Sequence, residues 1–188
     1  MEDVETRVVI GVGVLSVQER AGTQSTILER LYEQHAHALY RFALALVGSA
    51  EDAEDAVQEV FVRIARDPAR LERVIELRCY LFTATRNAAY GILRRRQRAG
   101  RLDDALRTEL TGSLQAVDSG GSVDAASVFR AFAQLPVDQR EVLVLKVFDG
   151  MTFKEIAGTL GVSQNTAASR YRYGIAKLRR ALEVSESG

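Results

Sequence analysis

The chain has 188 residues and carries as many acidic as basic side chains, so its formal net charge is zero, and 47% of its residues are hydrophobic. This length suits one large or two small domains with ordinary globular cores. A single cysteine, Cys79, excludes a disulfide framework or a metal cluster built from cysteines and is typical of a reducing cytoplasm.

Residues 1–25 form an N-terminal extension to which the sequence assigns no role. Its apolar run, residues 8–17, is too short to span a membrane. Acidic residues precede this run, whereas a secretory signal begins with a basic region. We therefore expect a flexible or strand-like extension and no membrane segment.

Helical periodicity dominates the rest of the chain and proline is scarce, so we expect an all-α fold. A first helix is predicted over about residues 26–47. Ser49 and Asp52 can cap a second helix, which must stop before Pro68 because the residue before proline avoids helical angles. A third helix is predicted over about residues 76–98.

The second and third predicted helices carry charges of opposite sign. Acidic side chains gather between residues 51 and 59, and a basic run occupies residues 94–98. Upstream of that run, Tyr80, Phe82 and Tyr90 alternate with arginine and asparagine. Aromatic rings can stack on unpaired bases and arginine can neutralise phosphates, so the third helix suits single-stranded nucleic acid. A core helix with a solvated basic end would have the same composition.

The composition changes between residues 99 and 122, where glycine, serine and aspartate accumulate. This segment is predicted to be a flexible linker between two small helical domains, residues 26–98 and 123–184. A tether of this length lets the two domains engage separate sites at the same time.

The second domain contains the pattern of a helix-turn-helix. Thr152 and Glu155 fit a capping box, Gly161 suits a left-handed helix end, and Ser163 is a good N-cap for the next helix. The polar side of that next helix carries amides and arginine, which pair with base edges in a major groove. The side chains expected to contact duplex DNA are Gln164, Asn165, Thr166, Ser169, Arg170, Arg172 and Tyr173. A solvated face of an ordinary helical bundle is the plainer interpretation of the same pattern.

On these motifs, the chain resembles the extracytoplasmic-function (ECF) sigma factors of bacterial RNA polymerase, within the sigma-70 family. The segment from Leu31 to Arg63, with its run Gly-Ser-Ala-Glu-Asp-Ala-Glu-Asp-Ala-Val-Gln-Glu-Val-Phe, is similar to their region two. The segment from Leu135 to Arg179 is similar to their region four. The two motifs in this order, on a chain of this size, are specific to that family.

The resemblance implies a role for each part of the chain. Region two would dock on core polymerase and hold the melted -10 promoter strand, and region four would recognise the -35 duplex. The residues implied in -10 contact are Arg86, Asn87, Tyr90, Arg94, Arg95 and Arg96. The residues implied in polymerase docking are Asp55, Gln58 and Glu59. Members of this family are also commonly controlled by an anti-sigma factor.

We therefore predict a cytoplasmic sigma factor that directs promoter-specific initiation and uses no cofactor or metal. A stand-alone helix-turn-helix regulator is the alternative, but it would leave the acidic helix and the aromatic–arginine helix without a purpose. An enzyme is not expected, because His35 and His37 point to different faces of a helix. No cluster of cysteine, histidine or carboxylate accompanies them to complete a site.

Overall fold

The computed structural model describes residues 17–98 and 131–186, with side chains over residues 27–98 and 131–183. The regular elements in these ranges are helical, as the periodicity predicts. In chain order they are α1 (Val17–Val47), α2 (Ala50–Arg66), the 3-10 helix η1 (Pro68–Arg73), α3 (Leu77–Arg98), α6 (Val137–Leu143), the π-helical turn η2 (Val144–Phe148), α7 (Phe153–Leu160) and α8 (Gln164–Glu186). The predicted linker, residues 99–122, lies outside the described ranges.

One expectation about the N-terminus is wrong. Helix α1 begins at Val17 and not near residue 26, so the end of the expected flexible or strand-like extension is helical. Gln18, Glu19 and Arg20 are good helix formers, and the helix that follows gives them a template to extend. Residues 1–16 lie outside the described ranges.

Helices α1, α2 and α3 form the first helical body, which we call the N-terminal body. Its core centres on the rings of Phe42 and Phe82, which meet edge to face with their centroids 5.3 Å apart. Helix α2 starts where predicted, because the Ser49 hydroxyl accepts a hydrogen bond from the backbone N–H of Asp52. The apolar stripe of α2 is buried against α1 and α3: Ala53, Ala56, Val57, Val60, Phe61 and Ile64.

Helices α6, α7 and α8, with η2, form the second helical body, which we call the C-terminal body. The capping box of Thr152 and Glu155 is present, and Gly161 ends α7 in the left-handed conformation with a φ of 68°. Ser163 then accepts a hydrogen bond from the N–H of Thr166 at 3.0 Å, which caps α8. These contacts confirm the predicted helix-turn-helix and fix the direction in which α8 leaves the turn.

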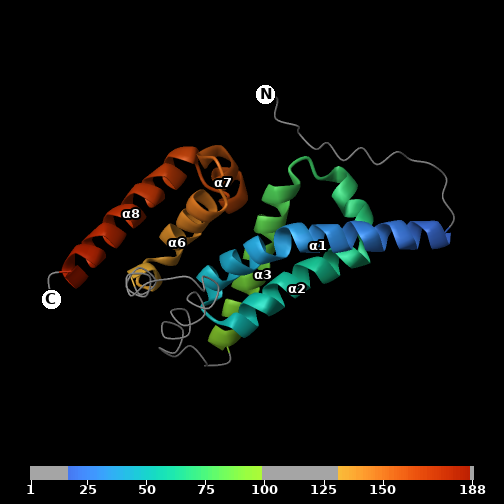
Figure 1. Cartoon of the computed structure of the whole chain (residues 1–188), viewed down its shortest axis with the longest axis horizontal. Coiled ribbons are helices and arrows are strands. Elements are labelled where there is room, and N and C mark those ends of the chain that lie inside the picture. The colour runs from blue at the N-terminus through green and yellow to red at the C-terminus, as the bar shows by residue number, and fades with distance from the viewer. Residues whose placement is uncertain (1–16, 99–130, 187–188) are drawn as a thin grey trace.

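The two bodies pack against each other. Figure 1 shows α6, α7 and α8 gathered at one end of the group that α1, α2 and α3 form. Helices α1 and α3 supply the surface of the N-terminal body, and α6, η2 and α7 supply that of the C-terminal body. Among the described helices, including the long α1, α3 and α8, none combines the length and apolar character needed to cross a membrane.

Gly174 sets the distance between α8 and α6. A Cβ atom placed on Gly174 would lie 2.9 Å from Cδ1 of Leu143 and 3.5 Å from Cβ of Gln139. Leu143 is buried and has little room to move. The absent side chain at Gly174 therefore lets α8 pack closely on α6.

We expect Gly174→Val to destabilise the C-terminal body by about 1–3 kcal/mol, the usual cost of overpacking a core. Gly158→Ala on α7 is the matched control, because a Cβ there meets nothing within 4 Å. The control should be neutral or stabilising by up to about 1 kcal/mol through helix propensity. Urea unfolding followed by circular dichroism measures both variants. Equal stability of Gly174→Val and the wild-type chain would contradict the close packing.

Candidate nucleic-acid interface

The polar side of α8 faces solvent. Buried Ala167 anchors the opposite side of the helix on the C-terminal body, and the Tyr171 ring packs edge to face on Phe153. The predicted duplex-contacting residues that are exposed are Gln164, Asn165, Thr166, Arg172 and Tyr173. Tyr173 is 64% exposed, which is high for a large aromatic side chain. An outward row of amide, guanidinium and phenol groups matches the chemistry of base edges and phosphates.

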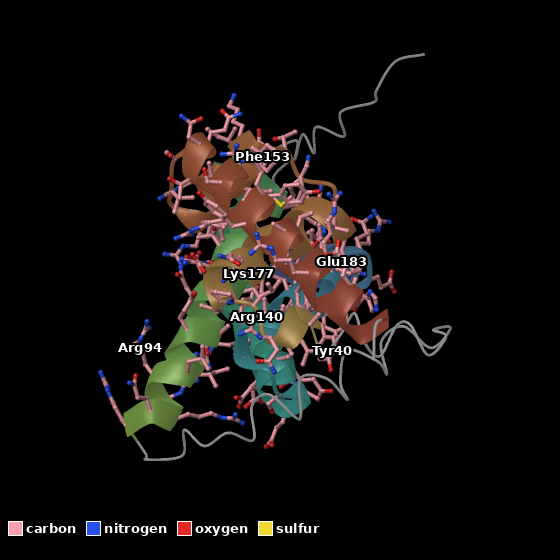
Figure 2. The ribbon with its side chains drawn as sticks, turned by 90° about the vertical axis from the view of Figure 1, so that its left-hand side faces the viewer. Tyr40, Arg94, Arg140, Phe153, Lys177 and Glu183 are labelled. Carbon is pink, nitrogen blue, oxygen red and sulfur yellow. The ribbon has the colours of Figure 1, made fainter. Side chains whose placement is uncertain are left out.

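Four of the predicted duplex-contacting residues also have partners within the protein. Half-buried Ser169 accepts a hydrogen bond from a terminal nitrogen of Arg172 at 3.4 Å. Nε of Arg170 lies 3.2 Å from Oδ2 of Asp138 on α6, so this half-buried arginine ties α8 to its support. Thr166 belongs to the cap, where its Oγ1 lies 2.8 Å from Oγ of Ser163. The outward side also includes exposed Lys177, one turn after Tyr173, which the sequence analysis did not select (Figure 2). Its spacing of four residues from Tyr173 was the available signal.

Arg86 and Tyr90 on α3 meet a carboxylate from the other body. Nε of Arg86 donates to Oε1 of Glu141 at 2.7 Å, and the Tyr90 hydroxyl donates to the same oxygen at 3.1 Å. The Arg86 guanidinium also lies over the Tyr90 ring, 4.8 Å from its centroid. Burial raises the pKa of Tyr90, and the charge of Glu141 raises it further, so the phenol stays protonated as a donor.

Glu141 is the residue at this contact that the sequence analysis missed. It belongs to α6 and is 0% exposed. Glutamate side chains are almost never fully buried unless they are paired, as Glu141 is here. The sequence offers one weak signal, a carboxylate placed directly before the apolar run Val-Leu-Val-Leu. Its partners lie more than fifty positions earlier in the chain, so spacing could not have found them.

A second carboxylate joins the same two bodies. Oδ1 of buried Asp149 lies 3.2 Å from a terminal nitrogen of Arg41 on α1. Arg78 on α3 donates to the backbone carbonyl of Asp149, and the Thr83 hydroxyl donates to the carbonyl of Thr159 at 3.2 Å. Burial raises the pKa of Asp149, and the charges of Arg41 and Arg78 partly oppose that rise.

The arginines at the basic end of α3 differ in exposure and in how closely they are paired. Asn87, Arg94 and Arg95 are exposed, and Arg94 projects from the helix in Figure 2. Arg96 instead points to the start of α2, where its Nε lies 2.7 Å from Oδ2 of Asp52 and a terminal nitrogen lies 3.4 Å from Oγ of Ser49. Arg96 therefore holds the end of α3 against the N-cap of α2.

The outer side of α2 is acidic. Asp55 and Gln58 are exposed, as are the neighbouring Glu51 and Glu54. Glu59 is half-buried; it pairs with Arg63 one turn later, and its other oxygen lies 3.9 Å from Arg95. The negative charge available to a partner therefore comes mainly from the first turns of α2.

The remaining titratable groups form no metal site. Within residues 17–98 and 131–186, no cluster of three or more histidine, cysteine, aspartate or glutamate side chains has metal-binding geometry. His35 is half-buried, and its pKa is lowered by burial and then by the charge of Arg78. The ring of His37 faces Arg41, with Nδ1 3.1 Å from a terminal guanidinium nitrogen.

Known families match both bodies. The family described as sigma-70 region 2 matches residues 31–99, and the family described as sigma-70, region 4 matches residues 126–178. The ECF RNA polymerase sigma factor SigL of Mycobacterium tuberculosis is 30% identical over 171 residues, covering 89% of this chain and 95% of that relative. The RNA polymerase sigma factor CarQ of Myxococcus xanthus is 31% identical over 163 residues, covering 87% and 92% of the two chains.

Solved structures share the arrangement of the helices. The protein CnrH, solved in complex with the cytosolic domain of CnrY, is 26% identical with a TM-score of 0.60 over 89% of this chain and 94% of CnrH. The sigma factor RpoE of Bartonella quintana, solved with the anti-sigma factor NepR, is 24% identical with a TM-score of 0.61 over 89% of this chain and 99% of RpoE. The second likeness is one of fold alone.

Arg96 gives a prediction about stability. We expect Arg96→Ala to lower the free energy of unfolding by about 1–3 kcal/mol, because it leaves the buried Asp52 carboxylate without its charged donor. Arg94→Ala, two positions away and exposed, should change it by less than about 0.5 kcal/mol. Chemical unfolding of both variants measures the difference. Equal losses would show that the Arg96–Asp52 pair does not hold α3 against α2.

Proposed function

The chain belongs to the ECF sigma factors of the sigma-70 family, and from this premise we propose how its surfaces divide the steps of promoter recognition. It is an RNA polymerase sigma factor, a transcription initiation factor that acts with core polymerase on promoter DNA. A stand-alone regulator is less well supported, because sigma-70 regions two and four both match. We assign region two to residues 26–98, the linker to residues 99–122 and region four to residues 123–184.

We propose that α8 recognises the -35 element in the major groove. The proposal draws on the exposed amides of Gln164 and Asn165 and the outward guanidinium of Arg172. Thr166, Ser169 and Tyr173 would position the helix on phosphates. Arg170 would act near the edge of the interface, because it also pairs with Asp138. This outward polar side, fixed by two caps and Gly174, is the observation that carries the proposal.

We propose that α3 holds the melted -10 strand. Arg86, Asn87 and Tyr90 would contact bases, since a phenol ring and a guanidinium plane both accept a stacked base. Arg94 and Arg95 would neutralise the backbone, with Arg96 as the least accessible member of the set because it is bound to Asp52. The alternative is a core helix whose basic end is merely solvated. It predicts that the chain has no preference for single-stranded over duplex DNA.

We propose that the acidic side of α2 docks on core polymerase through Asp55, Gln58 and Glu59. Asp55 and Gln58 are exposed and directed away from the core of the N-terminal body. Glu59 would contribute less charge, because Arg63 and Arg95 already share it. A basic surface on the polymerase is the complement that this acidic side requires.

We further propose that the chain performs no covalent chemistry itself and works in the cytoplasm, where polymerase and promoter DNA meet. Sigma factors act as initiation factors and leave RNA synthesis to the polymerase. A separate regulatory protein is a further proposed partner, because CnrH and RpoE were each solved with another protein bound. An anti-sigma factor is the class of partner that the RpoE complex suggests.

The proposed function is tested by adding the chain to core polymerase and sequencing the transcripts from a promoter library. We expect promoter-dependent transcripts, and we expect the promoters that produce them to share one -35 sequence and one -10 sequence. In the same assay Arg172→Ala should weaken use of the selected promoters roughly tenfold, the usual loss of one base or phosphate contact. Arg30→Ala, an exposed arginine on α1, is the control and should act as wild type.

Measuring binding to core polymerase distinguishes a wrong assignment of α8 from a failure of the sigma-factor mechanism as a whole. Arg172→Ala should co-purify with core polymerase as well as wild type does, and loss of that binding would mean that α8 is misassigned. Absence of promoter-dependent transcripts from an active core enzyme would reject the sigma-factor mechanism for this chain.

Asp55→Arg should weaken attachment to core polymerase, because it places a positive charge where the partner surface is proposed to be basic. We expect a several-fold or larger rise in Kd, measured by fluorescence anisotropy with labelled chain. Glu33→Arg makes the same charge change at an exposed site on α1 and should bind normally. Equal weakening by both variants would indicate a long-range charge effect and would argue against a docking site on α2.

A further inference from the structure

Gly91 lies inside α3, where the described part of the fold does not account for a glycine. Gly161 has a positive φ and Gly174 packs closely on α6, whereas Gly91 lies in regular helical backbone. A Cβ atom on Gly91 would meet the tips of Arg95 and Arg94, at 3.6 and 4.0 Å, which are ordinary contact distances. Glycine also weakens a helix interior relative to alanine. The missing side chain therefore has a cost for α3 and no evident benefit in packing.

The side of α3 that carries Gly91 is basic and faces solvent. Asn87 lies one helical turn before Gly91, and Arg94, Arg95 and Arg98 follow within two turns, so helical spacing places all four around it. These four side chains are exposed, and Arg94 extends from the helix in Figure 2. Gly91 thus leaves a bare stretch of helix backbone within a row of polar and positive groups.

Two guanidinium groups converge over this bare backbone. The position of a Cβ atom on Gly91 is 3.6 Å from Nη1 of Arg95 and 4.0 Å from Nη2 of Arg94, so both groups approach the same small volume. Glu59 lies 3.9 Å from the other terminal nitrogen of Arg95, so this ion pair does not use the nitrogen nearest Gly91. Two positive groups repel each other, and an anion between them would accept hydrogen bonds from both.

A phosphate oxygen fits the volume over Gly91. Hydrogen bonds from arginine to phosphate are about 2.7–2.9 Å long, so small rotations of Arg94 and Arg95 bring both within reach of an oxygen at this place. Glycine permits a ligand to approach the backbone closely. A methyl group on residue 91 would occupy the same volume and hold a nucleic-acid strand away from the helix.

We propose that Gly91, Arg94 and Arg95 form a binding site for a single phosphate of the melted promoter strand. Gly91 is a positioning residue, which lets this phosphate rest on the backbone of α3 between the two guanidinium groups. The proposal rests on the proposed assignment of α3 to the -10 strand, and it adds one defined phosphate to that assignment. A phosphate fixed one helical turn from Asn87 places the adjoining base within reach of the Asn87 amide.

The test compares Gly91→Ala with Gly158→Ala in the full chain. Gly158 on α7 is the matched control, because a Cβ atom there meets nothing within 4 Å. Both substitutions replace a helical glycine by alanine, so both should raise the Tm measured by circular dichroism by about 2–4 °C. Strand binding is measured by fluorescence anisotropy with a labelled, mixed-sequence single-stranded oligodeoxynucleotide over a range of salt concentrations.

We expect Gly91→Ala to weaken strand binding about fivefold at about 0.1 M salt. The slope of log affinity against log salt concentration should become shallower by about 0.7, the counterion-release share of one phosphate on a single strand. Gly158→Ala should bind as wild type does. In a background that carries Arg94→Ala and Arg95→Ala, Gly91→Ala should have no further effect on binding, because the site already lacks its donors.

A purely structural role of Gly91 would not change the salt slope. Unchanged affinity of Gly91→Ala, or weaker binding with an unchanged slope, would overturn the proposal. A lower Tm of Gly91→Ala would also overturn it, because the fold itself would then need the glycine. Unchanged strand binding together with weaker binding to core polymerase would assign the site to a carboxylate of the polymerase and reject the phosphate.

Transcription by holoenzyme with the wild-type chain distinguishes this proposal from the proposed function. Promoter-dependent transcripts together with unchanged strand binding by Gly91→Ala would leave the sigma function intact and reject the phosphate site alone. Absence of such transcripts from an active core enzyme, together with weaker strand binding by Gly91→Ala, would reject the sigma-factor mechanism and leave the phosphate site as a contact for single strands.

Discussion

A carboxylate that is fully buried must be met by donors, and Oε1 of Glu141 meets two of them from the other half of the chain, whereas Oε2 is buried without a hydrogen-bond partner. Its partners, Arg86 and Tyr90, lie on α3, so satisfying one charge on α6 brings two helical bodies together. Asp149 repeats the arrangement against Arg41. An unpaired charge in these positions would cost several kcal/mol, so the contact either forms with its partners or opens to water. In the arrangement that the structure describes, these charges are paired between the two bodies.

The pairing of buried charges bears on the zero net charge of the chain, because some of its opposite charges meet at the contact between the two bodies. Arg86 on α3 pairs with Glu141 on α6, and Arg41 on α1 pairs with Asp149 directly after η2, so these charges cancel between the two bodies. The acidic side of α2 stays exposed throughout and can meet a partner first.

Local sequence predicted the helices and the helix-turn-helix because their signals lie within a few residues. Thr152 and Glu155 meet across one helical turn, Gly161 reverses the backbone alone, and the Ser163 cap reaches only Thr166. The start of α1 was missed because polar helix formers such as Gln18 carry no apolar periodicity. The sequence analysis grouped Arg96 with the arginines implied in -10 contact. It could not show that Arg96 pairs with Asp52, since a run of arginines does not reveal which one turns back toward α2.

The sequence by itself determined an all-helical chain, two motif-bearing halves in a specific order and the polar side of α8, because each depends on periodicity and caps that short segments encode. Only the tertiary structure decided which charged groups are available. It buries Glu141 and Asp149, pairs Arg86, Tyr90 and Arg96 with partners on other helices, and leaves Asn87 and Arg172 exposed to solvent. The physical reason is that pairing of a buried charge depends on distance in space, and its partners here lie far away along the chain or on another helix.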